Sequence, residues 1–219
     1  MINIGKRLQT IAAFVDQGAI VADVGSDHGK LLVYLAEKSA ITKGYGIENK
    51  TGPFQTLEQN LKNAESQLLE AVFEDGINNL AADVDTLVLA GLGGDTIIAI
   101  LKANSDKLAN IKTIITDSHT ALGDVRRYIV ALGYLINNEK LIMERNKYYE
   151  ITKFVKCKES VTYSDFEYRR GPIIIRTPEF KPYAKKEIAK IDALLKKDLP
   201  SAIKKVLNEE REILKTYEN

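Results

Sequence analysis

The sequence predicts a doubly wound α/β fold: a mostly parallel sheet with an antiparallel edge hairpin, followed by a small C-terminal helical, coiled-coil-like domain. Up to about residue 155, short apolar runs that end in acids and glycines alternate with longer segments of helical period. From Tyr183 onward glycine is absent, and Lys, Glu, Leu, Ile and Ala dominate. We therefore expect one domain over residues 1–160, and a linker with a helical domain over residues 161–219.

The individual elements follow from the same patterns. Buried parallel strands are expected at 19–25, 43–49, 85–91 and 111–117, because both faces of such strands are covered by helices. Helical spacing separates them at 29–39, 52–67 and 93–109. Two β-type runs within 134–160, divided by the turn sequence RNK, predict the hairpin. Beyond Tyr183, two consecutive helices are expected, with Pro200 in the first turn of the second.

The apolar residues of these two helices predict one packed face on each. The first face would carry Ile188, Ile191, Leu194 and Leu195, and the second Ile203, Val206, Leu207, Ile213 and Leu214.

The composition limits the expected cellular compartment and the expected binding partners of the protein. The single cysteine, Cys157, cannot form an internal disulfide, and no apolar run approaches the roughly 20 residues that cross a bilayer. We therefore expect a cytoplasmic protein with no membrane association. Residues 1–155 carry 16 Lys and Arg against 19 Asp and Glu, whereas residues 156–219 carry 15 against 11. A basic C-terminal part could face a polyanion, although a solvated lysine face explains the same asymmetry.

The stretch VADVGSDHGKL, residues 21–31, occupies the first strand-to-helix turn, where ligands of doubly wound sheets bind. A dinucleotide site needs glycines there so that backbone can approach a pyrophosphate. Here Asp27 stands at the second glycine position, and Asp23 precedes the turn. Carboxylates would repel a pyrophosphate but suit the ammonium, sulfonium and ribose diol of S-adenosylmethionine. Asp23 could hold the ammonium while Gly25 lets the backbone pass close.

Acids and glycines also follow the next strands. Glu48 lies 23 residues after Gly25, about where an acid grips a ribose diol. Asp75 and Gly76 follow a third apolar run and could place a carboxylate near an adenine amino group. Three glycines, Gly91, Gly93 and Gly94, end the 85–91 strand and open a floor where cofactor and substrate can meet. Each feature alone is also explained by turn formation.

At these residues the sequence resembles the bacterial tRNA adenine-22 N1-methyltransferases (TrmK), a class I S-adenosylmethionine-dependent family. The resemblance rests on GKRLQTIAAFV, ADVGSDHGKL, ENKTGPFQTLEQN, EDG, LAGLGG, DVRRYIVALGY, YYEI and RRGPIII, in that order. It implies a Rossmann-like catalytic domain, a C-terminal helical domain, and methyl transfer to N1 of an adenine in the tRNA D-arm. Where the family shows a Gln-Pro-Asn-like stretch near the substrate, this chain has Asp117, Ser118 and His119.

The predicted site has three groups of residues. The expected cofactor residues are Asp23, Gly25, Ser26, Asp27, His28, Gly29, Glu48, Asn49, Asp75, Gly76, Ala90, Gly91, Leu92 and Gly93. The catalytic candidates are Asp27 and Asp117, because a carboxylate would accept a hydrogen bond from the exocyclic amine and stabilise charge that moves onto the adenine. The expected substrate residues are Gly94, His119, Arg126, Arg127, Tyr148, Tyr149, Arg169, Arg170, Lys185, Lys186, Lys196, Lys197, Lys204 and Lys205.

Three interpretations remain open at this point. We favour a tRNA methyltransferase that uses S-adenosylmethionine, binds no metal and acts as a monomer, with a homodimer left open. Two histidines without clustered cysteines make a poor metal site. A catalytically silent binding module on the same scaffold is the second interpretation, motivated by Asp117, Ser118 and His119. An NAD(P)-dependent oxidoreductase is the third, and the acids of the first turn disfavour it.

Overall fold

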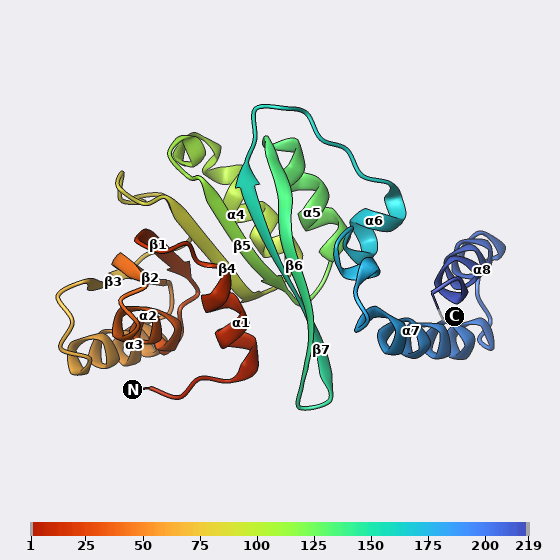
Figure 1. The fold of residues 1–219 in the computed structure, drawn as a ribbon, viewed down its shortest axis with the longest axis horizontal. Coiled ribbons are helices and arrows are strands. Elements are labelled where there is room, and N and C mark those ends of the chain that lie inside the picture. Colours follow the sequence, from red (N-terminus) through yellow and green to blue (C-terminus); the bar gives the residue numbers. More distant parts are fainter. Residues whose placement is uncertain (1, 218–219) are drawn as a thin grey trace.

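The computed structural model describes residues 2–217 and contains one seven-stranded sheet, in the order β3-β2-β1-β4-β5-β7-β6 (Figure 1). The strands are β1 (Ala19–Val24), β2 (Ile41–Glu48), β3 (Leu69–Phe73), β4 (Thr86–Leu92), β5 (Thr113–Ser118), β6 (Tyr134–Glu144) and β7 (Lys147–Lys156). The first five are parallel, and β7 runs antiparallel to both β5 and β6. The predicted doubly wound sheet with an antiparallel edge hairpin is confirmed.

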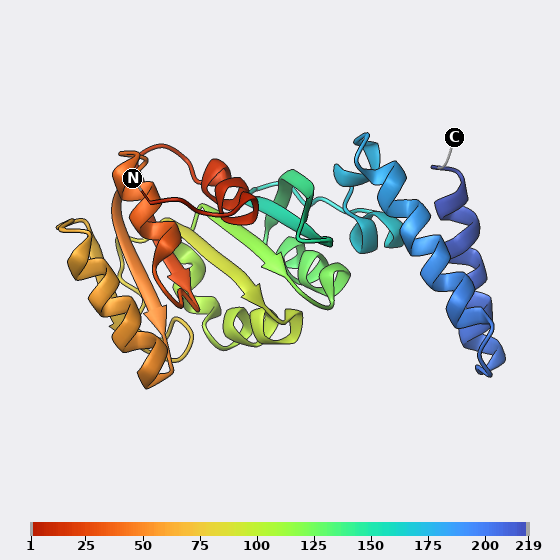
Figure 2. The same cartoon turned by 90° about the horizontal axis from the view of Figure 1, so that it is seen from below.

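Helices cover both faces of the sheet (Figure 2). On one face lie α1 (Lys6–Phe14), α2 (Lys30–Glu37) and α3 (Thr51–Asn63), and on the other lie α4 (Gly94–Ala103), the 3-10 turn η1 (Ser105–Ala109) and α5 (Leu122–Ala131). Every residue of β5 is buried, as expected for a strand covered on both sides. The order of the strands reverses between β1 and β4, which both pair with their neighbours in parallel. The carboxyl ends of these two strands therefore mark the switch point where ligands bind.

The hairpin of β6 and β7 turns at Arg145 and Asn146, which both have positive φ, at 48° and 61°. Such a two-residue turn matches the right-handed twist of the flanking strands. The hairpin is long, and its tip extends beyond the rest of the sheet (Figure 1). It thereby presents Lys147 and the following tyrosines next to the C-terminal helices.

The C-terminal part contains α6 (Asp165–Arg170), a 3-10 turn η2 (Ile174–Arg176), α7 (Phe180–Leu195) and α8 (Ser201–Lys215). The last two pack as an antiparallel pair at one end of the molecule (Figure 2). A third apolar cluster joins them to the sheet, because Leu141 of β6 packs with Phe180, Tyr183 and Leu214. None of the helices among residues 2–217 is both long and apolar enough to cross a membrane.

Two details of the C-terminal prediction were wrong. Leu194, expected on the packed stripe of α7, is 39% exposed, and three of the α8 residues expected on a packed face, Ile203, Val206 and Ile213, are also exposed. The reason is that α7 and α8 bury only one narrow apolar seam between them, which Leu207 and Leu214 occupy on α8. Pro200 precedes α8 as its N-cap residue and does not lie within its first turn.

Candidate active site

The turn after β1 has a backbone that only particular residues can adopt. Gly25 and Gly29 have φ of 73° and 67°, and Asp27 between them has φ of 49°. Aspartate tolerates this left-handed conformation better than most side chains do. The amides of Gly25 and Ser26 both donate to the carbonyl of Ile47, at 2.9 and 3.1 Å, and so fasten the turn to β2.

Asp23, near the end of β1, is the most strongly buried acid of this turn. It is 6% exposed, and Ser26 Oγ donates a hydrogen bond to its Oδ2 at 2.7 Å. Burial raises the pKa of Asp23 to about 6, against the opposing effects of the Ser26 hydrogen bond and of the Arg7 charge. A carboxylate held in this way gains when a cationic ligand arrives, because the ligand replaces the lost solvation.

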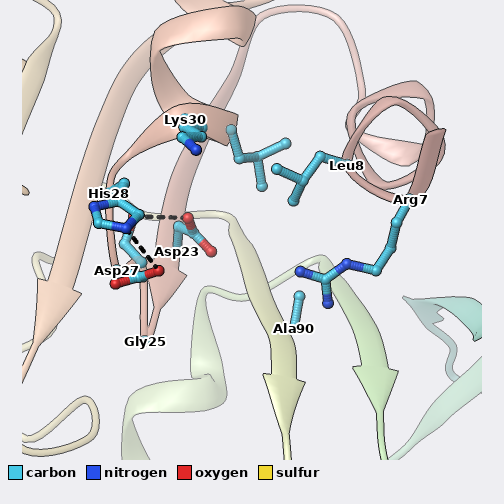
Figure 3. Close-up of a pocket in the computed structure, with 10 residues that line it drawn as sticks. Arg7, Leu8, Asp23, Gly25, Asp27, His28, Lys30 and Ala90 are labelled. Atoms are coloured by element: carbon cyan, nitrogen blue, oxygen red, sulfur yellow. Dashed lines mark hydrogen bonds and ion pairs between the residues drawn. The ribbon is translucent and has the colours of Figure 1, made fainter. Parts of the chain in front are cut away.

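These residues line a pocket of about 210 Å³ at the switch point (Figure 3). Six of its residues belong to the predicted cofactor set, namely Asp23, Gly25, Ser26, Asp27, His28 and Ala90. Arg7 and Leu8 of α1 close it from the opposite side, and Lys30 and Leu31 of α2 complete it. His28 Nε2 lies 3.4 Å from Asp27 Oδ2, and both side chains are largely exposed.

Arg7 is the main residue that sequence reasoning missed. Its Nη1 donates to Asp117 Oδ2 at 2.7 Å, so α1 is tied to the end of β5. The motif GKRLQ contains Arg7, but without an assigned α1 nothing in the sequence placed it opposite the first turn. The pocket therefore contains the cation Arg7 opposite the two predicted acids, in addition to Lys30.

Asp117 is completely buried at the end of β5. Its Oδ1 is enclosed and accepts no hydrogen bond from any of residues 2–217. Burial raises the pKa of Asp117, whereas the charge and the hydrogen bond of Arg7 lower it. An enclosed carboxylate oxygen without a donor is costly, and a ligand that offered an N–H group would remove that cost.

His119 and Gly91 lie beside Arg7, which binds Asp117. Gly91 has φ of 77°, and a Cβ there would lie 3.4 Å from Arg7 Nη1 and 4.0 Å from His119 Nε2. His119 is exposed, and burial of part of its ring together with the charge of Lys147 lowers its pKa. The imidazole is therefore neutral near pH 7, and its ring lies edge-on to Tyr149 with centroids 6.3 Å apart.

The other predicted cofactor residues lie at the same sheet edge but outside this pocket. Glu48 Oε1 accepts the amides of Asn49 and Lys50, each at 3.0 Å, and Asn49 Nδ2 donates to Asp75 Oδ1 at 2.8 Å. Asp75 and Gly76 line a separate open depression against α4. The structure thus brings the ends of β2 and β3 together, with Glu48 buried and Asn49 and Asp75 exposed.

Two predicted glycines have packing roles. A Cβ on Gly29 would lie 2.8 Å from Leu57 Cδ1 and Leu61 Cδ2, so this glycine lets α3 approach the first turn. A Cβ on Gly94 would lie 2.4 Å from the carbonyl oxygen of Thr120. Gly94 is therefore covered by the loop after β5 and is not available to a substrate. Gly93 and Leu92 connect β4 to α4, and the Leu92 side chain lies 3.2 Å from a Cβ built on Gly25.

Arg126 does not have the predicted role of phosphate contact. It is 1% exposed, and its guanidinium donates to Glu139 and Glu150, each at 2.8 Å, and to the carbonyl of Tyr168 at 3.1 Å. All of its nitrogens are thus engaged inside the protein, between α5, the hairpin and α6. Arg127, its neighbour, is exposed and pairs with Asp165 at 3.0 Å.

The remaining basic residues divide into two kinds. Arg169 and Arg170 both bind Glu210 of α8, at 2.7 and 2.8 Å, and Arg170 also binds Glu187 at 3.0 Å. These two arginines hold the helical pair to α6. The predicted lysines Lys185, Lys186, Lys196, Lys197 and Lys205 are exposed and Lys204 is half-buried. Tyr148 and Tyr149 are half-buried and line a second cleft with Lys186.

A doubly wound sheet with acids in the first turn at the switch point is the scaffold of a class I methyltransferase. The chain belongs to the methyltransferase domain family, whose profile matches residues 4–152. The tRNA (adenine(22)-N(1))-methyltransferase of Bacillus subtilis is 28% identical over 152 residues, which is 68% of this chain and 64% of that protein. This chain thus matches slightly less than two thirds of the length of that relative.

Solved structures extend the similarity to the whole chain. The crystal structure of Streptococcus pneumoniae Sp1610, provisionally described as a tRNA (m1A22) methyltransferase, superposes with a TM-score of 0.92 at 28% identity. That alignment covers 99% of this chain and 100% of the other. Its complex with S-adenosyl-L-methionine has a TM-score of 0.90 at 29% identity, with the same coverage. The resemblance to the TrmK family, inferred from the sequence motifs, is confirmed.

The residues present fit S-adenosylmethionine. The turn at Gly25 leaves a space that a Cβ would fill, only 3.2 Å from Leu92. Asp23 supplies a buried carboxylate for an ammonium group, and Arg7 supplies a cation for a carboxylate on the other wall. No group of three or more His, Cys, Asp or Glu residues within residues 2–217 could hold a metal ion.

Proposed function

We propose that this protein is an S-adenosylmethionine-dependent methyltransferase that modifies N1 of adenine 22 in the D-arm of tRNA. The observation that carries the proposal is the pocket at the carboxyl ends of β1 and β4, in which buried Asp23 beside the first turn lies opposite Arg7 of α1. The activity named for the Bacillus subtilis relative, together with the cofactor complex of Sp1610, supports it. The tRNA substrate and the position of methylation are part of the proposal.

The cofactor supplies an electrophilic methyl group on a sulfonium. In the proposed arrangement Asp23 holds the ammonium end, Gly25 lets the backbone approach, and Glu48 binds the ribose hydroxyls through the oxygen that does not accept the Asn49 and Lys50 amides. Asp75 would lie toward the adenine end. These residues lie at the carboxyl ends of three neighbouring parallel strands, so they form one edge on which an extended ligand can lie.

N1 of adenine has a free lone pair, so no residue must first remove a proton. The lone pair forms the new N–C bond while the S–C bond breaks, and the positive charge passes from sulfur to the adenine ring. Asp117 is suited to accept a hydrogen bond from the exocyclic amine and to stabilise that charge, because its buried Oδ1 has no donor within residues 2–217. Alignment of the reactants would provide most of the acceleration, about 7 to 11 kcal/mol in favourable cases.

Asp27 is the weaker catalytic candidate, since its side chain is 65% exposed and lies next to His28. A charge in that position is screened by water and has little effect on a distant adenine. We therefore assign the catalytic carboxylate to Asp117.

Methylation of tRNA transcripts tests the proposal directly. The protein is incubated with S-adenosylmethionine and unmodified tRNA, and the digested RNA is analysed for 1-methyladenosine by mass spectrometry. We expect product with the natural sequence and none with a transcript in which guanine replaces adenine 22. Cofactor binding by calorimetry, without product on any tRNA, would contradict the enzyme and favour a silent binding module. Binding of NAD in place of S-adenosylmethionine would point to an oxidoreductase.

A further inference from the structure

A second cleft, of about 420 Å³, lies between the tip of the β6–β7 hairpin and α7. The hairpin contributes Lys147, Tyr148 and Tyr149, and α7 contributes Lys186 and Lys190. Ser118 and His119, which follow Asp117 directly, also line it. The cleft therefore exists only because the sheet and the C-terminal helices meet, and none of its lining residues belongs to the cofactor pocket.

The cleft has unneutralised positive charge. It contains four cations, Lys147, Arg170, Lys186 and Lys190, and two carboxylates, Glu150 and Glu187. Both carboxylates already have partners: Glu150 binds Arg126, and Glu187 binds Arg170 and Lys190. Lys147 and Lys186 make no ion pair with any of residues 2–217.

These two lysines cover the faces of two tyrosines. Lys147 Nζ lies 5.0 Å from the centre of the Tyr149 ring, and Lys186 Nζ lies 5.1 Å from that of Tyr148. Both lysines are exposed and have flexible side chains, so an arriving phosphate can draw the ammonium groups away from the rings. The same movement frees an aromatic face on which a base can stack.

Arg7 connects this cleft to the cofactor pocket. Its guanidinium carbon lies 5.5 Å from the centre of the Tyr149 ring, its Nη1 binds Asp117, and the residue lines the cofactor pocket. A base on Tyr149 is thus one side chain away from the pocket that would hold the methyl donor.

We propose that the cleft between the hairpin and α7 binds the extruded target nucleotide of the RNA, with Tyr149 as the stacking platform and Lys147 and Lys186 as the phosphate contacts. This inference rests on the proposed function. N1 lies on the pairing edge of adenine, so the base must leave its stack before it can react. The cleft provides both an aromatic surface and cationic groups for that extruded state.

The stacking role is tested with the intact protein and tRNA that lacks the base at position 22. We expect Tyr149→Ala to weaken binding of complete tRNA by about 5- to 150-fold, since stacking on an aromatic side chain is worth that much per base. Tyr149→Phe, which keeps the ring, should bind within about twofold of the unmodified protein. On the abasic tRNA the Tyr149→Ala loss should disappear, whereas an abasic site at position 21 should leave it unchanged. Equal losses on all three RNAs would overturn the stacking role.

The phosphate role is tested by the salt dependence of tRNA binding. The double variant Lys147→Gln/Lys186→Gln should bind more weakly and lower the slope of log K against log salt by about 1.5, which corresponds to two lost phosphate contacts. The matched control Lys102→Gln/Lys107→Gln removes two exposed lysines of α4 and η1 that do not line the cleft, and it should leave the slope unchanged. Equal slopes for both double variants would overturn the phosphate role.

Failure of this inference is distinguishable from failure of the proposed function. If the unmodified protein methylates adenine 22 while the Tyr149 and lysine variants bind all RNAs normally, the activity stands and the cleft assignment falls. If the unmodified protein forms no 1-methyladenosine, the proposed function falls first.

Discussion

Two buried carboxylates, Asp23 near the end of β1 and Asp117 near the end of β5, differ in their hydrogen-bond partners. Asp23 receives one neutral hydrogen bond from Ser26, whereas Asp117 receives a charged one from Arg7. A hydrogen bond from a charged donor is roughly twice as strong as a neutral one. Asp117 is therefore held in place before any ligand binds, whereas Asp23 still requires a cation.

The raised pKa of Asp23 predicts a pH dependence of cofactor binding. In the folded protein the pKa is about 6, above the ordinary value of 3.8, so the folded state binds the extra proton between these values. The contribution of Asp23 to folding stability is therefore lost as the pH rises from 4 to 6. A cationic ligand binds the protein when the Asp23 carboxylate is ionised. The affinity for S-adenosylmethionine should rise about tenfold from pH 5 to pH 7, measured by calorimetry.

Two variants separate Asp23 from its neighbours in this experiment. Asp23→Asn should bind the cofactor weakly at every pH, with no slope between pH 5 and pH 7. Asp27→Asn is the matched control, because Asp27 is 65% exposed, and it should keep the slope of the unmodified protein. A tenfold slope that persists in Asp23→Asn would assign the titration to another group.

At the scale of elements, the first turn and α3 constrain each other through Gly29. The residue combines a φ of 67° with methyl groups of Leu57 and Leu61 at 2.8 Å from the position of a Cβ. Glycine at this position therefore allows both the left-handed backbone of the turn and the close packing of α3 against it. Asn60 Nδ2 of the same helix donates to the carbonyl of His28 at 3.0 Å and fixes the turn from below.

Gly29→Ala should lower the free energy of unfolding by about 2 to 5 kcal/mol, the sum of left-handed backbone strain and overpacking. Gly52→Ala is the matched control, since Gly52 lies within α3 and a Cβ there meets nothing within 4 Å. That variant should be neutral or more stable by up to about 1 kcal/mol. Urea unfolding followed by circular dichroism measures both. A Gly29→Ala variant as stable as Gly52→Ala would show that α3 can shift without loss.

At the scale of the whole molecule, sequence patterns predicted the sheet, the hairpin and the two-part organisation because their signals are local. Buried strands such as β5 are continuous apolar runs, and the turn at Arg145 and Asn146 interrupts two β-type runs. The acid-rich turn at Asp23 was equally visible, because it departs from a known glycine pattern. The division at residue 160 stays a proposal, since the apolar cluster with Leu141 crosses it.

Long-range pairing explains what the sequence could not predict. Arg126 and Arg127 are adjacent in sequence, yet helix geometry turns the first inward with Val125 and Ile129 and the second outward. Only the fold shows that Arg126 forms ion pairs with Glu139 and Glu150 of the hairpin. Arg7 and Asp117 are likewise 110 residues apart. From the sequence alone, charged residues in such pairs are predicted to be on the surface, because their partners are identified only when the strand order is known.

The C-terminal helices are joined to the rest of the protein by charge as well as by apolar contact. Glu210 of α8 is 7% exposed and accepts hydrogen bonds from Arg169 and Arg170 of α6, at 2.7 to 3.0 Å. Tyr183 of α7 donates to Glu150 of β7 at 2.9 Å, and Glu150 also binds Arg126. These contacts set the position of α7 and hence the width of the proposed nucleotide cleft.

Glu210→Gln should therefore loosen α8 without disturbing the cofactor pocket. Loss of a charged, partly buried hydrogen bond is worth about 1.5 to 3 kcal/mol, so amide exchange in α8 should accelerate by roughly 10- to 150-fold while exchange in β1 and β4 stays unchanged. S-adenosylmethionine should bind normally, and the KM for tRNA should rise. Glu209→Gln, at an exposed neighbouring position 4.0 Å from Lys205, should change none of these quantities. If α8 exchange remained slow in Glu210→Gln, the apolar seam at Leu207 and Leu214 would be sufficient to hold the helical pair, and the position of α7 would not depend on this ion pair.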